Sequence, residues 1–352
     1  MKKSIFLRLT IAYLFLAGCL MGCSQTVPDA LSPTQSLSGD SQDTELSVDS
    51  NHSDTSPSGS ITLSEDSENV PGGATVPESG STRDNTPLCL VPTVDGTAET
   101  HNETASIDYS NASQGYITAN YMGTCPKVRL RITGPDQVIY TYVLHGGGYE
   151  TFPLSSGNGS YDVTIYENIS GTDYATCLYA KVPVQLEDEF TPFLYPNQYV
   201  NFTSESKVVA KGAELAADAA NDLDVVTNIY NFIIDSITYD YDKASDPPTG
   251  YTTDVDTILE SGTGICLDYA AVMASMLRSQ RIPTRLEVGY AQDSYHAWIS
   301  VYIEDIGWLN GIIEFDGSVW TLVDPTFGAN TDDNTLKKFI GDGSNYILQK
   351  MY

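Results

Sequence analysis

The chain has 352 residues, with 17 Lys and Arg against 46 Asp and Glu, which gives a formal net charge of −29. Nucleic acids are bound through clustered basic side chains, so this balance argues against a nucleic-acid partner. The length is sufficient for more than one domain. The sequence has no CxxC pair and no Cys/His cluster at zinc spacing, so we expect neither a metal site nor a cofactor.

The first residues have the pattern of an export signal. Lys2 and Lys3 precede an apolar run at residues 9–18, which is shorter than the ~20 residues that span a bilayer. Cys19 in LAGC and Cys23 in LMGC follow, and this pattern resembles a bacterial lipoprotein signal. We expect lipidation at Cys23, which a polar tail follows, or at Cys19, the better consensus match. A plain secretory signal with incidental cysteines is the alternative.

Residues 1–23 would thus form the signal peptide and residues 24–85 a tether. The second stretch is rich in Ser, Thr, Asp, Glu, Gly and Pro, and Arg83 is its only Lys or Arg. Such a segment cannot bury enough apolar surface to offset the entropy lost on ordering, so we expect disorder. The predicted location is extracellular, with a lipid anchor in the outer face of the bacterial cell membrane.

Residues 86–203 have the pattern of an all-β sandwich domain. Alternating runs rich in Tyr, Val, Ile and Thr recur between turns, among them KVRLRITG, VIYTYVL and GSYDVTIYEN. Cys125 and Cys177 either pair as a disulfide, which export permits, or remain separate thiols. The many tyrosines either pack the strands, which we favour, or form a platform for carbohydrate or peptide.

Residues 204–352 have a mixed helical and strand pattern. Val226, Ile229 and Ile233 recur at helical spacing, which predicts a helix that faces the core. The turn-rich stretch at residues 245–254 is long for a connection inside a compact domain and could border a binding cleft.

Three side chains in this part have the chemistry of a nucleophilic site. A helix is predicted to begin at Cys266, where its dipole and free N–H groups favour a thiolate and can donate to an oxyanion. His296 lies on a predicted strand at residues 294–303, and Asp324 ends an apolar strand before Pro325. An imidazole stabilises a thiolate and returns its proton to a leaving amine, while a carboxylate orients the imidazole. Taken singly, a Cys or a His in such positions is more often structural.

The fragments GICLDYA, IPTR, VGY, HAW and VDPT, in this order, resemble the transglutaminase-like superfamily, a branch of the papain-like fold. The resemblance covers about residues 205–330, and the sequence ITYD that ends at Asp240 is similar to an I-x-Y-D element of that family. It implies an α+β fold in which a helix-borne cysteine packs on an antiparallel sheet.

The resemblance also implies roles for individual residues. Cys266 would be the nucleophile, His296 the acid–base and Asp324 the orienting acid. Trp298 and Tyr239 are weaker candidates, for the cleft wall and for oxyanion binding respectively, and core packing explains both equally well.

The implied activity is acyl transfer through a thioester on Cys266 with a protein or peptide substrate, for which cell-wall peptides are one candidate. Bacterial members of this family are often proposed to be proteases or amidases, so we favour hydrolysis over amine crosslinking. A non-catalytic surface module that binds peptide or glycan is the alternative, and a structural envelope protein is a third hypothesis.

Overall fold

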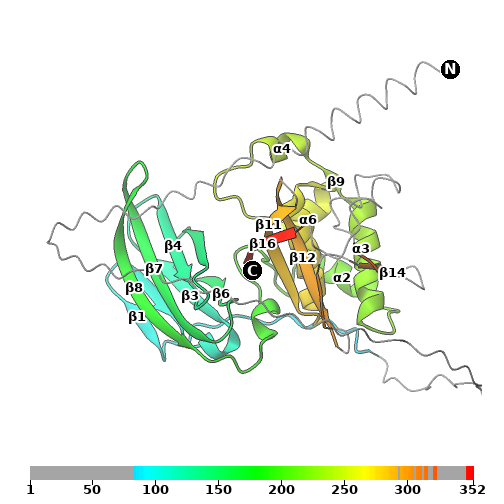
Figure 1. Cartoon of the computed structure of the whole chain (residues 1–352), viewed down its shortest axis with the longest axis horizontal. Coiled ribbons are helices and arrows are strands. Elements are labelled where there is room, and N and C mark those ends of the chain that lie inside the picture. Colours follow the sequence, from blue (N-terminus) through cyan, green and yellow to red (C-terminus); the bar gives the residue numbers. More distant parts are fainter. Residues whose placement is uncertain (1–82, 292–293, 305–306, 311–312, 316–319, 323–345) are drawn as a thin grey trace, which may run out of the picture. The chain divides into compact units, whose positions relative to one another are not determined.

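The structure is a computed structural model that describes residues 83–352, except 292–293, 305–306, 311–312, 316–319 and 323–345 (Figure 1). Cys19, Cys23 and Asp324 therefore lie outside the described residues, as does most of the predicted tether. None of the helices in the described part is long and apolar enough to cross a membrane.

The part of the chain before residue 200 is rich in strands, as predicted, and forms two four-stranded antiparallel sheets. The sheet β1-β2-β3-β6 comprises β1 (Glu99–His101), β2 (Ala105–Asp108), β3 (Tyr116–Tyr121) and β6 (Glu150–Pro153). The sheet β5-β4-β7-β8 comprises β5 (Ile139–Leu144), β4 (Val128–Thr133), β7 (Gly159–Ser170) and β8 (Asp173–Val184). Two short 3-10 helices, η1 (Ala112–Gln114) and η2 (Thr191–Phe193), lie outside these strands.

Alternation along the strands explains the core of these sheets. In β4, Val128, Leu130 and Ile132 are buried, and the residues between them are only partly so. Successive strand residues face opposite sides of a sheet, so one face packs inward while the other meets solvent. Cys125 and Cys177 are free thiols here, so the structure favours separate cysteines over a disulfide.

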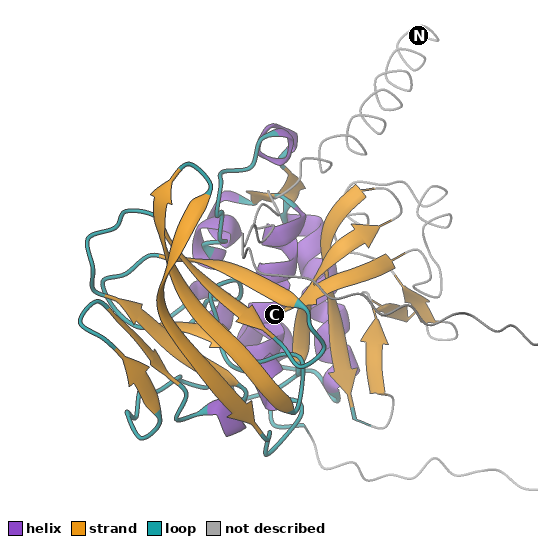
Figure 2. Cartoon of the chain, turned by 60° about the vertical axis from the view of Figure 1, so that its left-hand side comes forward, coloured by secondary structure: helices purple, strands orange, loops and turns teal. Residues whose placement is uncertain are grey.

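The part after residue 204 combines helices with a third four-stranded antiparallel sheet, so the predicted α+β class is confirmed (Figure 2). The helices are α2 (Lys207–Ala216), α3 (Asp222–Ser236), α4 (Tyr241–Ser245), α5 (Val255–Ser261) and α6 (Cys266–Ser279). The sheet has the order β13-β12-β11-β16 and comprises β13 (Gly307–Asn310), β12 (Ser294–Ile303), β11 (Thr284–Ala291) and β16 (Tyr346–Met351). Two small pairs are also present, β9 (Thr238–Tyr239) with β10 (Thr263–Gly264), and β14 (Ile313–Phe315) with β15 (Trp320–Leu322).

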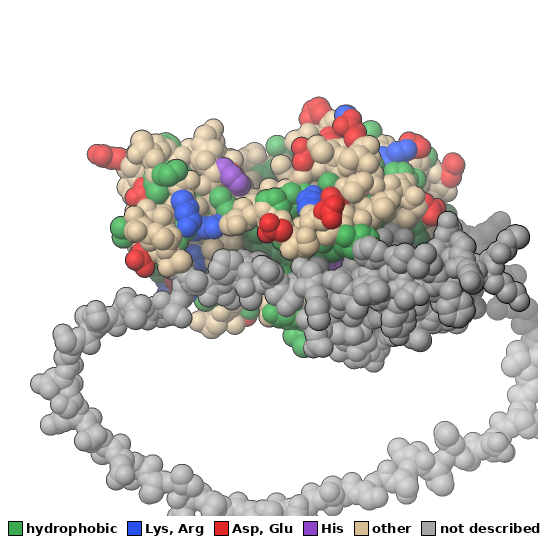
Figure 3. Space-filling view, turned by 90° about the horizontal axis from the view of Figure 1, so that it is seen from above, with side chains coloured by type: hydrophobic (Ala, Val, Ile, Leu, Met, Phe, Trp, Pro, Cys, Tyr) green, Lys and Arg blue, Asp and Glu red, His purple; other side chains and the backbone are tan. Residues whose placement is uncertain are grey.

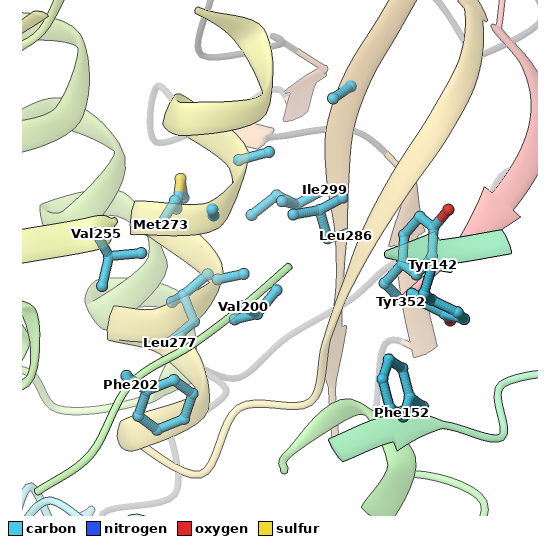
Figure 4. Packing of buried hydrophobic residues seen from close by; sticks show 14 of the residues in the cluster. Tyr142, Phe152, Val200, Phe202, Val255, Met273, Leu277, Leu286, Ile299 and Tyr352 are labelled. Atoms are coloured by element: carbon cyan, nitrogen blue, oxygen red, sulfur yellow. The ribbon is translucent and has the colours of Figure 1, made fainter. Parts of the chain in front are cut away.

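Helix α6 lies at the centre of this second part. All of its residues except Leu267 are buried, and it packs against α2, α3, α5, β11 and β12. Figure 4 shows it between Val255 of α5 on one side and Leu286 and Ile299 of the sheet on the other. A helix that is buried on all sides belongs in the core of a domain, and this one carries the predicted nucleophile at its first residue.

The first described residues pack against the same helical part. Arg83 Nε donates to Asp222 Oδ1 at 2.6 Å, and the backbone N–H of Leu88 donates to the carbonyl of Ser279 at 2.8 Å. Asn85 also donates to the carbonyl of Ala219 at 3.0 Å. Arg83 and Asn85, which the sequence assigned to the tether, thus contact the region between α2 and α3 and the end of α6.

Arg278, in the last turn of α6, is buried and joins three distant segments. Its guanidinium donates to the carbonyls of Thr284 at 3.0 and 2.7 Å, Tyr195 at 2.7 Å and Tyr352 at 2.7 Å. The fixed fork of a guanidinium can reach several acceptors at once, whereas an ammonium is a single point. Arg278 therefore holds Tyr352 and the segment around Tyr195 against the end of α6.

We expect Arg278→Lys to lower the free energy of unfolding by about 3 kcal/mol, because a lysine leaves buried carbonyls without donors. Urea unfolding followed by circular dichroism measures the change. The control is Arg281→Lys, since Arg281 pairs with an exposed Asp84 and an exposed pair contributes little. Equal midpoints for the two variants would contradict this role for Arg278.

Candidate functional site

Cys266 is the first residue of α6, as predicted, and it is buried. The backbone N–H of Ile265, just before it, donates to Asp268 Oδ2 at 2.9 Å. Gly264 packs closely against Asp268. A Cβ atom at position 264 would lie only 2.7 Å from the Cβ atom of Asp268. The carboxylate of Asp268 therefore fixes the turn that leads into Cys266, and this turn has room only for glycine at position 264.

Asp268 is fully buried and accepts hydrogen bonds on both oxygens. Tyr251 Oη and Thr253 Oγ1 each donate to Oδ1 at 2.7 Å, and Lys243 Nζ donates to Oδ2 at 2.8 Å. Lys243 Nζ also donates to the hydroxyl of Tyr251. A buried carboxylate is tolerated when it is paired and hydrogen-bonded, and these donors, with Ile265, satisfy it.

This cluster ties the turn-rich loop after α4 to the start of α6. Lys243 is on α4, and Tyr251 and Thr253 are on the loop that the sequence suggested as a cleft border. Burial by itself would lower the pKa of Lys243, but its hydrogen bonds to Asp268 and Tyr251 raise that pKa overall. The ammonium therefore stays charged and offsets the negative charge of Asp268 two residues from Cys266.

Tyr239, a weaker candidate from the sequence, is placed next to the same turn. Strand β9 pairs in parallel with β10, so Tyr239 lies opposite Gly264, and the N–H of Asp240 donates to the carbonyl of Gly264 at 2.9 Å. Tyr269 of α6 donates from its hydroxyl to the carbonyl of Ile237 at 2.5 Å. The ITYD element and the GICLDYA element, which are distant in sequence, are thus neighbours in space.

His296 lies on β12, one of the strands that α6 packs against, and it is buried. Its ring stacks with that of Trp298, with centroids 6.4 Å apart and an angle of 24° between the planes. Trp298 Nε1 donates to Glu287 Oε2 at 2.6 Å, and Ser300 Oγ donates to the same oxygen at 2.6 Å. Glu287 on β11 therefore holds Trp298, the ring beside the predicted acid–base residue.

Alternation along β12 separates two sets of residues. Ala297, Ile299 and Val301 belong to the hydrophobic core together with α6. His296 and Trp298 alternate with these three residues along the strand. That Cys266, His296 and Asp324 meet in one pocket stays a prediction, since Asp324 lies outside the described residues.

Sequence reasoning missed most of the groups that support Cys266. Asp268 was part of the recognised GICLDYA string but received no role, and Lys243, Tyr251 and Thr253 carried no signal because their partner is far along the chain. Glu287 was likewise missed. Within the described residues, no group of His, Cys, Asp and Glu side chains is arranged to hold a metal ion.

Comparison with models of known families assigns one part of the chain to a family. Residues 210–311 match the family model of the transglutaminase-like superfamily, and this range includes Cys266 and His296. The chain therefore contains a transglutaminase-like domain, as the motifs suggested. A search of curated proteins found no match.

Several solved structures are similar to the chain at 16% identity. A candidate cysteine protease from Cytophaga hutchinsonii has a TM-score of 0.35, with 73% of this chain and 74% of that chain covered. The periplasmic domain of TgpA from Pseudomonas aeruginosa has a TM-score of 0.30, with 65% and 97% covered. A transglutaminase from red sea bream has a TM-score of 0.24, with 60% and 48% covered. The assignment of the domain rests on the family match at residues 210–311.

We expect Lys243→Met to lower the free energy of unfolding by about 2 kcal/mol, because it leaves the buried Asp268 carboxylate without its cation. The cost is below that of breaking a fully buried pair, since the Lys243 side chain is 21% exposed. Urea unfolding measures it. Lys207→Met is the matched control, because Lys207 and Glu260 form an ion pair in which both side chains are 59% exposed. If Lys207→Met lowered the free energy of unfolding as much as Lys243→Met does, burial of the Lys243–Asp268 pair would not be the cause of the loss.

A second prediction concerns the pH dependence of stability through Glu287. Burial raises the pKa of this carboxyl above its ordinary value of 4.5, despite its hydrogen bonds to Ser300 and Trp298. Between the ordinary and the raised pKa, the unfolded chain has lost the proton that the folded chain keeps, so Glu287 costs stability as the pH rises through this range. Glu287→Gln should therefore gain stability relative to the wild type over the same range.

Urea unfolding of both proteins at a series of pH values tests this. The difference between variant and wild type should grow with pH and then level off above the raised pKa. The exposed Glu260→Gln should show no such growth. A difference for Glu287→Gln that is independent of pH, or that falls as the pH rises, would show that burial does not control this carboxyl.

Proposed function

We propose that the chain is a cysteine acyl-transfer enzyme in which Cys266 forms a thioester with a protein or peptide amide, with hydrolysis preferred over amine crosslinking. The Cys266 thiolate attacks the amide carbonyl and forms a C–S bond. The C–N bond then breaks as protonated His296 gives its proton to the departing amine. Water, deprotonated by His296, next attacks the thioester carbonyl and releases an acid and the free thiol.

Other residues have supporting roles in this proposal. Asp324 would accept a hydrogen bond from the second ring nitrogen of His296 and so fix its tautomer. N–H groups at the start of α6 would donate to the oxyanion, and Tyr239, opposite Gly264, is a second candidate donor. Trp298 lies beside His296 and is held by Glu287, which restricts the ring that borders the imidazole.

The observation that carries the proposal is the position of Cys266. The residue begins a buried helix, and the cluster around Asp268 fixes the turn before it. That helix packs on the strand with His296, and both residues lie within the matched family range. The buried Asp268 carboxylate and its counter-charge on Lys243 support the proposal because they hold the start of α6, and with it Cys266, in one geometry.

We also propose that the protein is exported and anchored by a lipid on Cys23 or Cys19. This rests on the signal-like start of the sequence and the polar stretch that follows it. Mass spectrometry of the mature N-terminal peptide would identify the modified residue. An N-terminal peptide that begins elsewhere and carries no lipid would remove the anchor from the proposal.

Alkylation by iodoacetamide tests the enzyme mechanism without a known substrate. Cys266 should react at about pH 6, because reactive cysteines at helix N-termini or beside His⁺ have lowered pKa values. Burial raises the pKa of Cys89, so this thiol is an internal control that should react at least roughly tenfold more slowly at that pH. Peptide mass spectrometry gives both rates in one sample.

His296→Ala should move the alkylation of Cys266 to higher pH, because the thiolate loses its imidazolium partner. Circular dichroism confirms that this variant is folded. If Cys266 in the wild type reacts no faster than Cys89 at that pH, the chain has no activated thiolate. A folded His296→Ala protein with an unchanged pH profile would show that the two side chains do not act together.

A further inference from the structure

The outward face of the sheet β5-β4-β7-β8 contains a polar groove. It has a volume of about 430 Å³ and lies across β4, β7 and β8. Arg131, Thr164 and Tyr179 form one cross-strand row through it, since Arg131 pairs with Thr164 and Thr164 with Tyr179. This row alternates with the buried residues of the same strands, so it belongs to the face away from the core of the strand-rich part.

Neighbouring rows extend the same surface on both sides. Arg129 is paired with Tyr166, and Tyr166 with Thr176. Thr133 is paired with Asp162, and Asp162 with Lys181. The three rows therefore present three basic side chains, two tyrosine rings and several hydroxyl groups around a single carboxylate.

The charge of this surface is opposite to that of the whole chain. The sequence carries a net charge of −29, whereas the three rows combine Arg129, Arg131 and Lys181 with Asp162 alone. Figure 3 shows a group of Lys and Arg side chains over the strand-rich part, at the left of that view. An anionic ligand repelled by most of the protein would find a local attraction here.

Some of the side chains that line the groove have donor groups or ring faces that are available to a ligand. Tyr179 is 50% exposed, and its hydroxyl donates to Asp162 Oδ1 at 2.5 Å, which orients the ring and occupies the carboxylate. Among the described residues, no hydrogen bond or ion pair engages the guanidinium of Arg131. A guanidinium with its fork unoccupied can bind a carboxylate or a phosphate with two parallel hydrogen bonds.

We propose that this groove is a binding site for an acidic polysaccharide. Arg131 and Arg129 would bind carboxylate groups, the rings of Tyr166 and Tyr179 would pack on sugar faces, and the threonines would bond to sugar hydroxyls. An acidic peptide is less suitable, because the groove lies on the face of the sheet. Extended peptides usually bind at a sheet edge, where the backbone is unpaired.

The surface also reaches the loop that is attached to the start of α6. Val143 of β5 lies in the row of Arg129, and its Cγ2 is 2.6 Å from where a Cβ atom of Gly250 would lie. Tyr251, the next residue, donates to Asp268. A polysaccharide in the groove would therefore lie on a surface that extends as far as this loop. Its binding does not depend on catalysis by Cys266.

Binding of the full chain to polygalacturonate, followed by isothermal titration calorimetry, tests the proposal. Neutral dextran and poly-glutamate serve as the comparison ligands. The wild type should bind polygalacturonate, lose affinity as salt is added, and bind dextran and poly-glutamate at least about tenfold more weakly. Cys266→Ala should bind as the wild type does, so failure of the proposed enzyme mechanism would leave this result unaffected.

Variants at the groove make the test specific. Arg131→Ala should weaken binding by about tenfold, the scale of one lost charge-assisted hydrogen bond, and Tyr179→Ala should also weaken it. Lys207→Ala removes the same charge from an exposed position on α2 and should have little effect. Equal losses for Arg131→Ala and Lys207→Ala would overturn the site, as would absence of wild-type binding. Tighter binding of poly-glutamate would replace the polysaccharide with an acidic peptide.

Discussion

The structure depends on one constraint, the burial of α6 with a charged side chain near each end. Asp268 in its first turn is satisfied by Lys243, Tyr251, Thr253 and the N–H of Ile265. Arg278 in its last turn is satisfied by backbone carbonyls. Because an unpaired buried charge is costly, each end of the helix requires particular distant segments to be in place. The fold of this part is therefore specified by polar partners at the ends of α6 as much as by its apolar sides.

The same constraint explains how the proposed nucleophile can lie in the core. The apolar sides of α6 hold the helix against the sheet, while the Asp268 cluster fixes the turn that precedes Cys266. The ammonium of Lys243 offsets a carboxylate that would otherwise disfavour a thiolate nearby. On β12, the network from Glu287 to Trp298 restrains the ring next to His296. Rigid support of this kind is what a catalytic arrangement requires, because small displacements of reacting groups are costly.

The two parts of the chain differ in where their polar groups lie. The helical part contains the buried polar clusters and the family match at residues 210–311. The strand-rich part contains an open basic surface within an acidic chain. An enzyme that acts on large substrates benefits when binding and chemistry are on separate surfaces, since remote contacts can hold a polymer while the site itself stays compact. The proposed polysaccharide site is therefore compatible with the proposed enzyme but does not require it.

The sequence by itself determined the main helices and strands and indicated the superfamily, and the residue types of the site are its prediction. Local periodicity predicted the strands of the first part, the helix that begins at Cys266 and the strand that carries His296, and the order of short motifs indicated the superfamily. Local patterns report only on neighbours along the chain, so they could not reveal that Lys243 and Tyr251 meet Asp268, or that Glu287 holds Trp298. They also left open whether Cys125 and Cys177 pair and on which face the basic residues gather. Tertiary structure decided these points, because contacts between distant residues depend on strand register and helix packing, which have no local signature in the sequence.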